Sequence, residues 1–304
     1  MSSTLNDLTQ QVSLTPYQAL GIPIALVGAM FLSVGAQLQH RGVAKVEKQH
    51  GGSSKGLNLK QILRLAGRPS WVIGTLMLGL AVVFQLTSLS FAPLIVVQPL
   101  GAVALVVTSI LNSRTTHQRL DRQSRRAILF CVGGVGLFVT VAAFTASEPR
   151  ITTAQLVTVL IILAVVFTIL LAAFTLFRRR IRALFYILAA GFLYGFVATL
   201  AKIVINRIES HSFDPLTVVC VVFLLAASVL GGYFVQNAYA SGPPDLVIAG
   251  LTVVDPMVAV GIGVIVLGEA SQAPWWAAVF YVIAGAIAIY GVFQLAKYHP
   301  ASRA

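Results

Sequence analysis

The chain has 304 residues, of which 58% are hydrophobic and only 10% carry a charged side chain. A typical soluble domain has charge on about a quarter of its residues, so this composition excludes one and indicates an integral membrane protein. The net charge is +12. The chain has no basic domain in which aromatic residues alternate with the basic ones, so we expect no nucleic acid among its partners.

Nine apolar stretches follow one another along the chain, each long enough to cross a bilayer. A hydrocarbon core about 30 Å thick is crossed by about 20 helical residues. The first 17 residues contain no basic side chain, so we expect the first stretch to remain as a helix and not to be cleaved as a signal peptide. The sequence thus predicts an all-α integral membrane protein with spans at residues 18–38, 71–91, 93–112, 127–146, 154–177, 183–205, 215–238, 244–267 and 276–296.

The basic residues are concentrated in alternate loops. The other loops between spans contain only Arg150 and Arg207. Because Lys and Arg gather in cytoplasmic loops, this pattern predicts a multi-pass plasma-membrane protein with its N-terminus outside and its C-terminus in the cytoplasm. Membrane lipids are expected partners of these loops. Eighteen of the 21 Lys and Arg residues lie within residues 39–70, 113–126, 178–182 and 297–304.

The two halves of the chain resemble each other. Spans two and three read FQLTSLSFAP and LIVVQPLGAV, and spans seven and eight read VQNAYASGPP and DLVIAGLTVVDPMVAV. Aligning Gln85 with Gln236 also aligns Pro93 with Pro244. An odd number of crossings separates the copies, so the second copy is inverted, as in many secondary transporters.

This repeat defines the predicted organisation of the chain. Two inverted four-helix repeats are joined by a central helix, and each end of the chain carries a short polar segment. The predicted units are an extracytoplasmic segment at 1–17, the first repeat at 18–146, a linker helix and basic loop at 147–182, the second repeat at 183–296 and a cytoplasmic tail at 297–304.

Asp255 is the first candidate for a functional residue. It lies eleven residues after the start of the eighth span, about 16 Å into the membrane. An ionisable side chain at that depth is a functional candidate by default. Pro256 follows it, and an Asp-Pro pair favours a helix break, at which the carboxylate either caps the next half-helix or binds substrate or a proton. With a six-residue insertion, the repeat aligns Gln98 and Pro99 with this pair, so a second break is expected at Pro99.

Other polar side chains within the spans are Gln85, Gln236, Asn237 and Lys202. Amides in a bilayer either link helices by hydrogen bonds or, together with Asp255, line a polar cavity between the halves. Lys202 lies near the outer end of the sixth span, where it either extends to the interface or binds substrate.

The sequence lacks signals of a cofactor, a metal site or an enzyme. Both cysteines, Cys131 and Cys220, lie within apolar spans, and no two histidines have the spacing of metal ligands. The chain contains neither HExxH nor GxSxG and no pair of intramembrane carboxylates. We therefore expect no cofactor, no metal centre and no catalytic residue.

The stretch FAPLIVVQPLGAVALVVTSILNSR resembles the drug/metabolite transporter superfamily, most closely its NIPA-like and EamA-like branch. Ala92, Pro93 and the run from Pro99 to Ala102 carry the match. The stretch GLTVVDPMVAVGIGVIVLGEA is similar to the signature of the second copy, which ends in the Gly-Glu of Gly268 and Glu269. We expect Glu269 to face water at the outer end of span eight. The resemblance implies a bundle of inverted repeats that carries a solute by a gradient or by exchange.

NIPA-like proteins are associated with magnesium transport, but this chain departs from their pattern. Members often have an intramembrane Gly-Glu in the helix before Ala-Pro, where this chain has Ala81 and Val82. Magnesium favours carboxylate ligands, so we expect alternating-access transport of a small organic metabolite or drug-like solute. Asp255 is then a candidate for proton coupling, since burial raises the pKa of a carboxyl group. The alternatives are transport of magnesium or another divalent cation, flipping of a lipid-linked substrate, and a non-transporting role beside an envelope-assembly complex.

Overall fold

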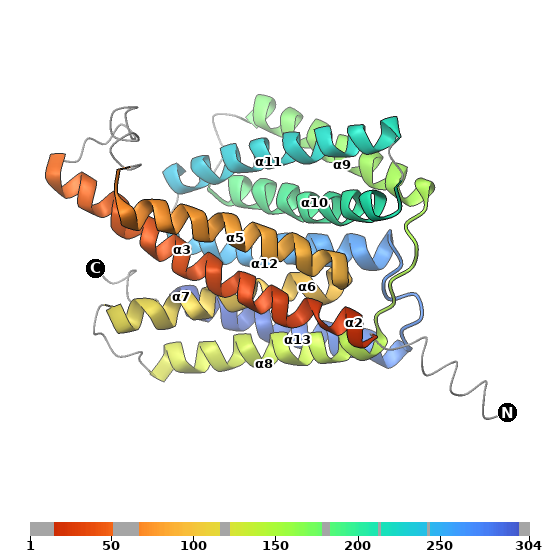
Figure 1. Ribbon diagram of the computed structural model, residues 1–304, viewed down its shortest axis with the longest axis horizontal. Coiled ribbons are helices and arrows are strands. Elements are labelled where there is room, and N and C mark those ends of the chain that lie inside the picture. Colours follow the sequence, from red (N-terminus) through yellow and green to blue (C-terminus); the bar gives the residue numbers. More distant parts are fainter. Residues whose placement is uncertain are drawn as a thin grey trace.

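The computed structural model describes residues 15–50, 67–115, 122–177, 183–211, 214–241 and 244–297. These residues form helices and short connections, and no strand is assigned among them (Figure 1). The predicted N-terminal segment up to residue 14, the basic loop 178–182 and the tail from residue 298 lie outside the described residues.

The predicted spans are confirmed within this part of the chain, which contains nine helices long and apolar enough to cross a membrane. The short helix α2 and α3 form the first span, and α6 and α7 form the third. The helices are α2 Pro16–Ala19, α3 Gly21–His50, α5 Pro69–Phe91, α6 Leu94–Leu100, α7 Ala102–Thr115, α8 Arg122–Thr145, α9 Thr153–Phe177, α10 Ala183–Glu209, α11 Pro215–Ser241, α12 Pro244–Ile265 and α13 Trp275–Lys297.

The helices pack mainly in pairs. In the first half α3 packs along α5, and in the second half α10 packs along α11 and also along α12. The fourth helix of each half, α8 and α13, packs against the other (Figure 1). The first and sixth spans therefore each pack along the span that follows them in the chain.

A sharp interruption separates α5 from α6. Helix α5 ends at Phe91, Ala92 and Pro93 are extended, and α6 begins at Leu94. Proline disfavours a helical conformation for the residue before it and has no N–H to donate, so the chain breaks here for local reasons. The break leaves free carbonyl groups at the end of α5 and free N–H groups at the start of α6.

Glycines allow the two repeats to approach closely. A Cβ atom at Gly134 of α8 would lie 2.4 Å from the backbone nitrogen of Ala288 in α13, and one at Gly291 would lie 2.3 Å from that of Cys131. Both contacts are with backbone atoms, which cannot rotate away as a side chain can. Small residues at helix interfaces are typical of membrane bundles, and here they bring α8 and α13 into direct backbone contact.

We expect Gly134→Ala to lower the free energy of unfolding by about 1–3 kcal/mol, because the added methyl group forces α8 and α13 apart. Gly133→Ala is the matched control, since its Cβ would meet nothing within 4 Å. Thermal unfolding of both variants in the same detergent measures the difference. An equal effect of the two substitutions would contradict the close contact between the helices.

The predicted orientation is tested by labelling in intact cells. Single cysteines are placed at Ser210 and Arg125, which are exposed at opposite ends of the bundle. The native Cys131 and Cys220 are buried and give little background. We expect a membrane-impermeant maleimide to label the Ser210→Cys variant in intact cells and the Arg125→Cys variant only after lysis, because Lys and Arg gather in cytoplasmic loops. The reverse pattern would overturn the orientation.

Candidate functional site

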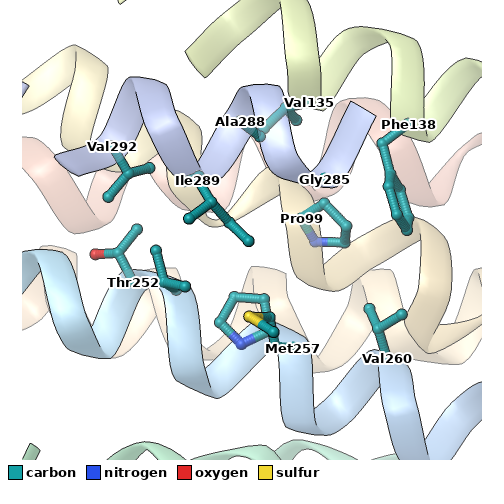
Figure 2. A pocket seen from close by; sticks show the side chains of 13 residues that line it. Pro99, Val135, Phe138, Thr252, Met257, Val260, Gly285, Ala288, Ile289 and Val292 are labelled. Atoms are coloured by element: carbon teal, nitrogen blue, oxygen red, sulfur yellow. The ribbon is translucent and has the colours of Figure 1, made fainter. Parts of the chain in front are cut away.

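A cavity lies between the two halves, among α6, α7, α8, α12 and α13 (Figure 2). It is partly open and has a volume of about 110 Å³. Thr252 is the one residue in its lining with a polar side chain. The lining residues are Pro99, Ala102, Val135, Phe138, Thr252, Val253, Pro256, Met257, Val260, Gly285, Ala288, Ile289 and Val292.

Two prolines that the repeat alignment pairs, Pro99 and Pro256, both line this cavity. They come from α6 and α12, one helix of each half. A proline has no N–H, so the carbonyl of the residue four positions earlier loses its helical partner; for Pro256 this is Thr252, which also lines the cavity. The cavity thus lies where the regular helical bonding of both repeats is interrupted.

The structure differs from the predicted helix breaks. Helix α12 continues through Asp255 and Pro256 without interruption, so the prediction of a break there is wrong. Helix α6 includes Pro99 and ends one residue later at Leu100. Tight packing of α12 on α10 overrides the preference of the residue before proline, because a Cβ at Gly191 would lie 2.6 Å from Val254 of α12.

Asp255 therefore does not cap a half-helix. It is partly buried, and its Oδ1 atom is shielded from solvent with no hydrogen-bond partner. Its counterpart in the repeat, Gln98, is 6% exposed, and the Nε2 atom of Gln98 also has no partner. An unsatisfied buried polar group costs about 1–3 kcal/mol. A free acceptor and a free donor in repeat-related positions beside the cavity are thus candidates for contacting a solute.

The break between α5 and α6 is stabilised by Glu269, which belongs to the segment after α12. The amide nitrogens of Leu94 and Ile95 donate hydrogen bonds to Oε1 and Oε2 of Glu269, both at 2.8 Å. The carboxylate therefore caps the first turn of α6, where a negative charge is favoured. The expectation that Glu269 faces water is wrong, since the residue is 2% exposed. Its burial follows from the free N–H groups that the break creates inside the protein.

Lys202 of α10 satisfies the other side of the same break. Its Nζ donates to the carbonyl oxygens of Leu89 at 2.7 Å and Ala92 at 3.0 Å, and it forms an ion pair with Glu148. A cation is favoured at the carbonyl end of a helix. Lys202 is 4% exposed, so the interpretation that it extends to the interface is wrong. Glu148 in turn accepts a hydrogen bond of 2.9 Å from Nε2 of Gln18.

These charged side chains form what we call the outer cluster: Glu148, Lys202 and Glu269. They surround a small recess together with Asn206. Burial raises the pKa of Glu269 to about 7, although the N–H groups of Ile95 and Leu94 and the Lys202 ammonium favour its ionised form. Glu269 can therefore exchange a proton near neutral pH, and a change in its charge bears directly on the contact with α6.

The remaining predicted amides do not join the cavity. Gln85 is partly buried in α5, and Gln236 is exposed on α11. Nδ2 of Asn237 donates to the carbonyl of Tyr233 in its own helix at 2.7 Å. The cavity is accordingly apolar in this conformation, and of the predicted site residues only the two prolines line it.

Sequence reasoning missed the roles of Glu148 and Glu269. The chain has nine acidic residues in all, and these two follow directly on the fourth and eighth spans. The signal that the sequence offered for both roles was the position of each acidic residue just after a predicted span. Its partners were not visible, because Glu269 lies 175 residues from Leu94 along the chain.

The part of the chain that the structure describes contains nine helices long and apolar enough to cross a membrane, so the fold is that of a multi-pass membrane protein. The family profile described as "Magnesium transporter NIPA" matches residues 17–221. This match covers more than half of the chain, so the protein belongs to the NIPA family.

The chain is also similar to individual proteins. The chain is similar to an uncharacterized protein of Corynebacterium glutamicum, with 26% identity over 260 residues that cover 84% of this chain and 88% of the relative. It is also similar to the "Probable magnesium transporter NIPA9" of Arabidopsis thaliana, with 23% identity over 225 residues that cover 70% of this chain and 65% of that protein. No solved structure matches the chain significantly.

The raised pKa of Glu269 predicts a pH-dependent stability. The folded protein keeps this proton up to about pH 7, whereas the unfolded chain releases it near the ordinary value of 4.5. The free energy of unfolding should therefore fall as the pH rises from 4.5 to 7, by up to about 3 kcal/mol, and then stay level. Thermal unfolding across this range measures the slope.

Glu269→Gln should remove this slope and lower stability at every pH, because the amide of glutamine turns a second donor toward the N–H groups of α6. Asp214→Asn is the matched control. The hydrogen bond from Arg207 holds the pKa of Asp214 below its ordinary value, so this variant should keep the wild-type slope between pH 5 and 7. A slope that survives in Glu269→Gln would assign the pH dependence to another group.

Proposed function

We propose that the protein is a secondary transporter that carries a small, largely apolar organic solute through the central cavity by alternating access. The observation that supports this most directly is the apolar lining of a cavity placed between the repeats and bordered by Pro99 and Pro256. Small-molecule sites typically have apolar walls and a few polar groups that orient the ligand. A hydrated magnesium ion instead needs oxygen ligands.

Gln98 and Asp255 supply the polar groups in this proposal. Each has an unpartnered buried atom next to a cavity-lining proline. Asp255 accepts a hydrogen bond or ion pair from a basic group of the solute, or takes up the coupling proton. Gln98 donates a hydrogen bond from the other repeat, so that the two halves contact the same molecule when it is bound.

The outer cluster acts as a gate in the same cycle. Lys202 and Glu269 belong to the second half and hold the α5–α6 break of the first half. Opening the bundle at this end requires these contacts to separate. Protonation of Glu269 weakens its contacts with the N–H groups of α6, because a neutral carboxyl group is the poorer acceptor. The gate thus links proton binding to the movement of one half against the other.

Magnesium transport is the second candidate. The description of the family and the name of the Arabidopsis relative favour it. Among the described residues no group of three or more His, Cys, Asp or Glu side chains has a metal-binding arrangement. Magnesium is often held by one or two carboxylates and its own waters, so in this alternative Asp255 is the ligand and the ion remains partly hydrated.

The first test identifies the solute by its effect on thermal stability of the purified protein. The panel contains magnesium, drug-like cations, amino acids, nucleotides and polyprenyl phosphates. A ligand at 100 times its dissociation constant adds about 2.7 kcal/mol to the free energy of unfolding. An organic hit supports the proposal, and a response to magnesium alone favours the second candidate.

Uptake of the hit into proteoliposomes then tests the cavity. Gly285 lines it, and a Cβ there would meet nothing within 4 Å, so Gly285→Leu should fill the cavity and reduce uptake at least tenfold without unfolding the protein. Gly133→Leu is the control, since Gly133 also has open space but does not line the cavity. Asp255→Asn should lose uptake as well. Wild-type rates in Gly285→Leu would exclude this cavity as the route.

A further inference from the structure

A second cavity lies where α8 begins and α13 ends. It is a groove between the first turns of α8 and the last turns of α13. The residues that matter in its lining are Gln123, Arg126, Leu129 and Phe130 from α8 and Tyr290 and Gln294 from α13. We call it the α8–α13 groove.

The groove is divided into a polar and an apolar part. Arg126 and Gln123 are exposed, and they lie one turn closer to the start of α8 than the apolar pair Leu129 and Phe130. Leu129 is 72% exposed and Phe130 is 45% exposed. Large apolar side chains exposed on a spanning helix face acyl chains, and an adjacent arginine reaches the level of the headgroups.

Two contacts position the side chains on the α13 side of the groove, one across the groove to α8 and one along α13. The rings of Phe130 and Tyr290 meet edge to face with their centroids 5.5 Å apart. Nε2 of Gln294 donates to the hydroxyl of Tyr290 at 2.7 Å. The Tyr290 hydroxyl accepts this bond and keeps its own hydrogen to donate to a ligand in the groove.

The charge around the groove is positive. Neither α8 nor α13 contains an acidic residue, and Asp121 before α8 lies outside the described residues. Arg122 precedes Arg126 by four residues and so lies on the same side of α8. Lys297 follows Gln294 by three residues and so lies on the same side of α13. A phosphate at Arg126 therefore meets several positive charges.

We propose that the α8–α13 groove binds an anionic phospholipid, with its phosphate at Arg126 and one acyl chain along Leu129 and Phe130. Basic pockets between helices at the headgroup level are typical sites for such lipids. A soluble anion would use the arginine alone and would not account for the exposed apolar pair beside it.

This site would regulate transport. Helices α8 and α13 are the fourth helices of the two halves, and they contact each other through Gly134 and Gly291. A lipid that contacts both helices stabilises that junction between the halves. The inference concerns a different cavity from the proposed solute route, so either one can fail without the other.

The experiment compares phosphatidylglycerol with phosphatidylcholine of the same acyl chains, added to the purified full-length protein in detergent. Bound lipid is counted by native mass spectrometry, and the thermal midpoint is measured in parallel. We expect phosphatidylglycerol to bind more tightly, and Arg126→Gln to weaken its binding about tenfold, because the substitution removes a charged hydrogen bond to the phosphate. Arg126→Lys should retain most of the preference for the anionic lipid.

Arg125→Gln is the matched control, since it removes the same charge from an exposed residue that does not line the groove. It should leave the preference for phosphatidylglycerol within twofold of wild type. Equal binding of the two lipids, an equal loss in both glutamine variants, or a full effect from inorganic phosphate alone would overturn the proposal. Tyr290→Phe provides a second test through the α13 wall and should weaken binding of phosphatidylglycerol.

Discussion

The facing ends of two successive spanning helices leave backbone groups that need partners, and this fold depends on how they are satisfied. The second span ends at Phe91 and the third begins at Leu94, so the turn at Ala92 and Pro93 has free carbonyls before it and free N–H groups after it. Lys202 donates hydrogen bonds to the carbonyls, and Glu269 accepts hydrogen bonds from the N–H groups. Lipid-exposed irregular backbone is not tolerated in the hydrocarbon region. Because both side chains come from the second half, the two halves share one set of obligatory hydrogen bonds.

The glycine contacts explain why a cavity remains elsewhere between the same halves. Where Gly134 and Gly291 bring α8 and α13 together, backbone meets backbone and no space is left. Around the cavity the prolines of α6 and α12 and small residues such as Ala102 of α7 and Gly285 of α13 leave the interior underfilled. The bundle is thus closely packed along the α8–α13 contact and open beside it.

The carboxylates of Asp255 and Glu269 lie at two different levels of the bundle. Asp255 lies beside the cavity with an unpartnered oxygen, whereas Glu269 is fully engaged at the outer cluster. A solute that enters the cavity meets only the first of them. In the proposed cycle, a change in the charge of Glu269 would act on the gate without contacting the solute, which is the arrangement required if two different ligands are to bias one conformational equilibrium.

The sequence by itself determined the nine spans, the family and the candidate Asp255, because each depends on local composition or on a short motif. A bilayer requires about 20 apolar residues per crossing wherever they occur in the chain. The tertiary structure alone decided the continuity of α12 through Pro256, the apolar lining of the cavity and the burial of Lys202 and Glu269. These depend on atoms brought together from positions as far apart as Leu94 and Glu269, and no local pattern encodes which free backbone group a distant side chain will satisfy.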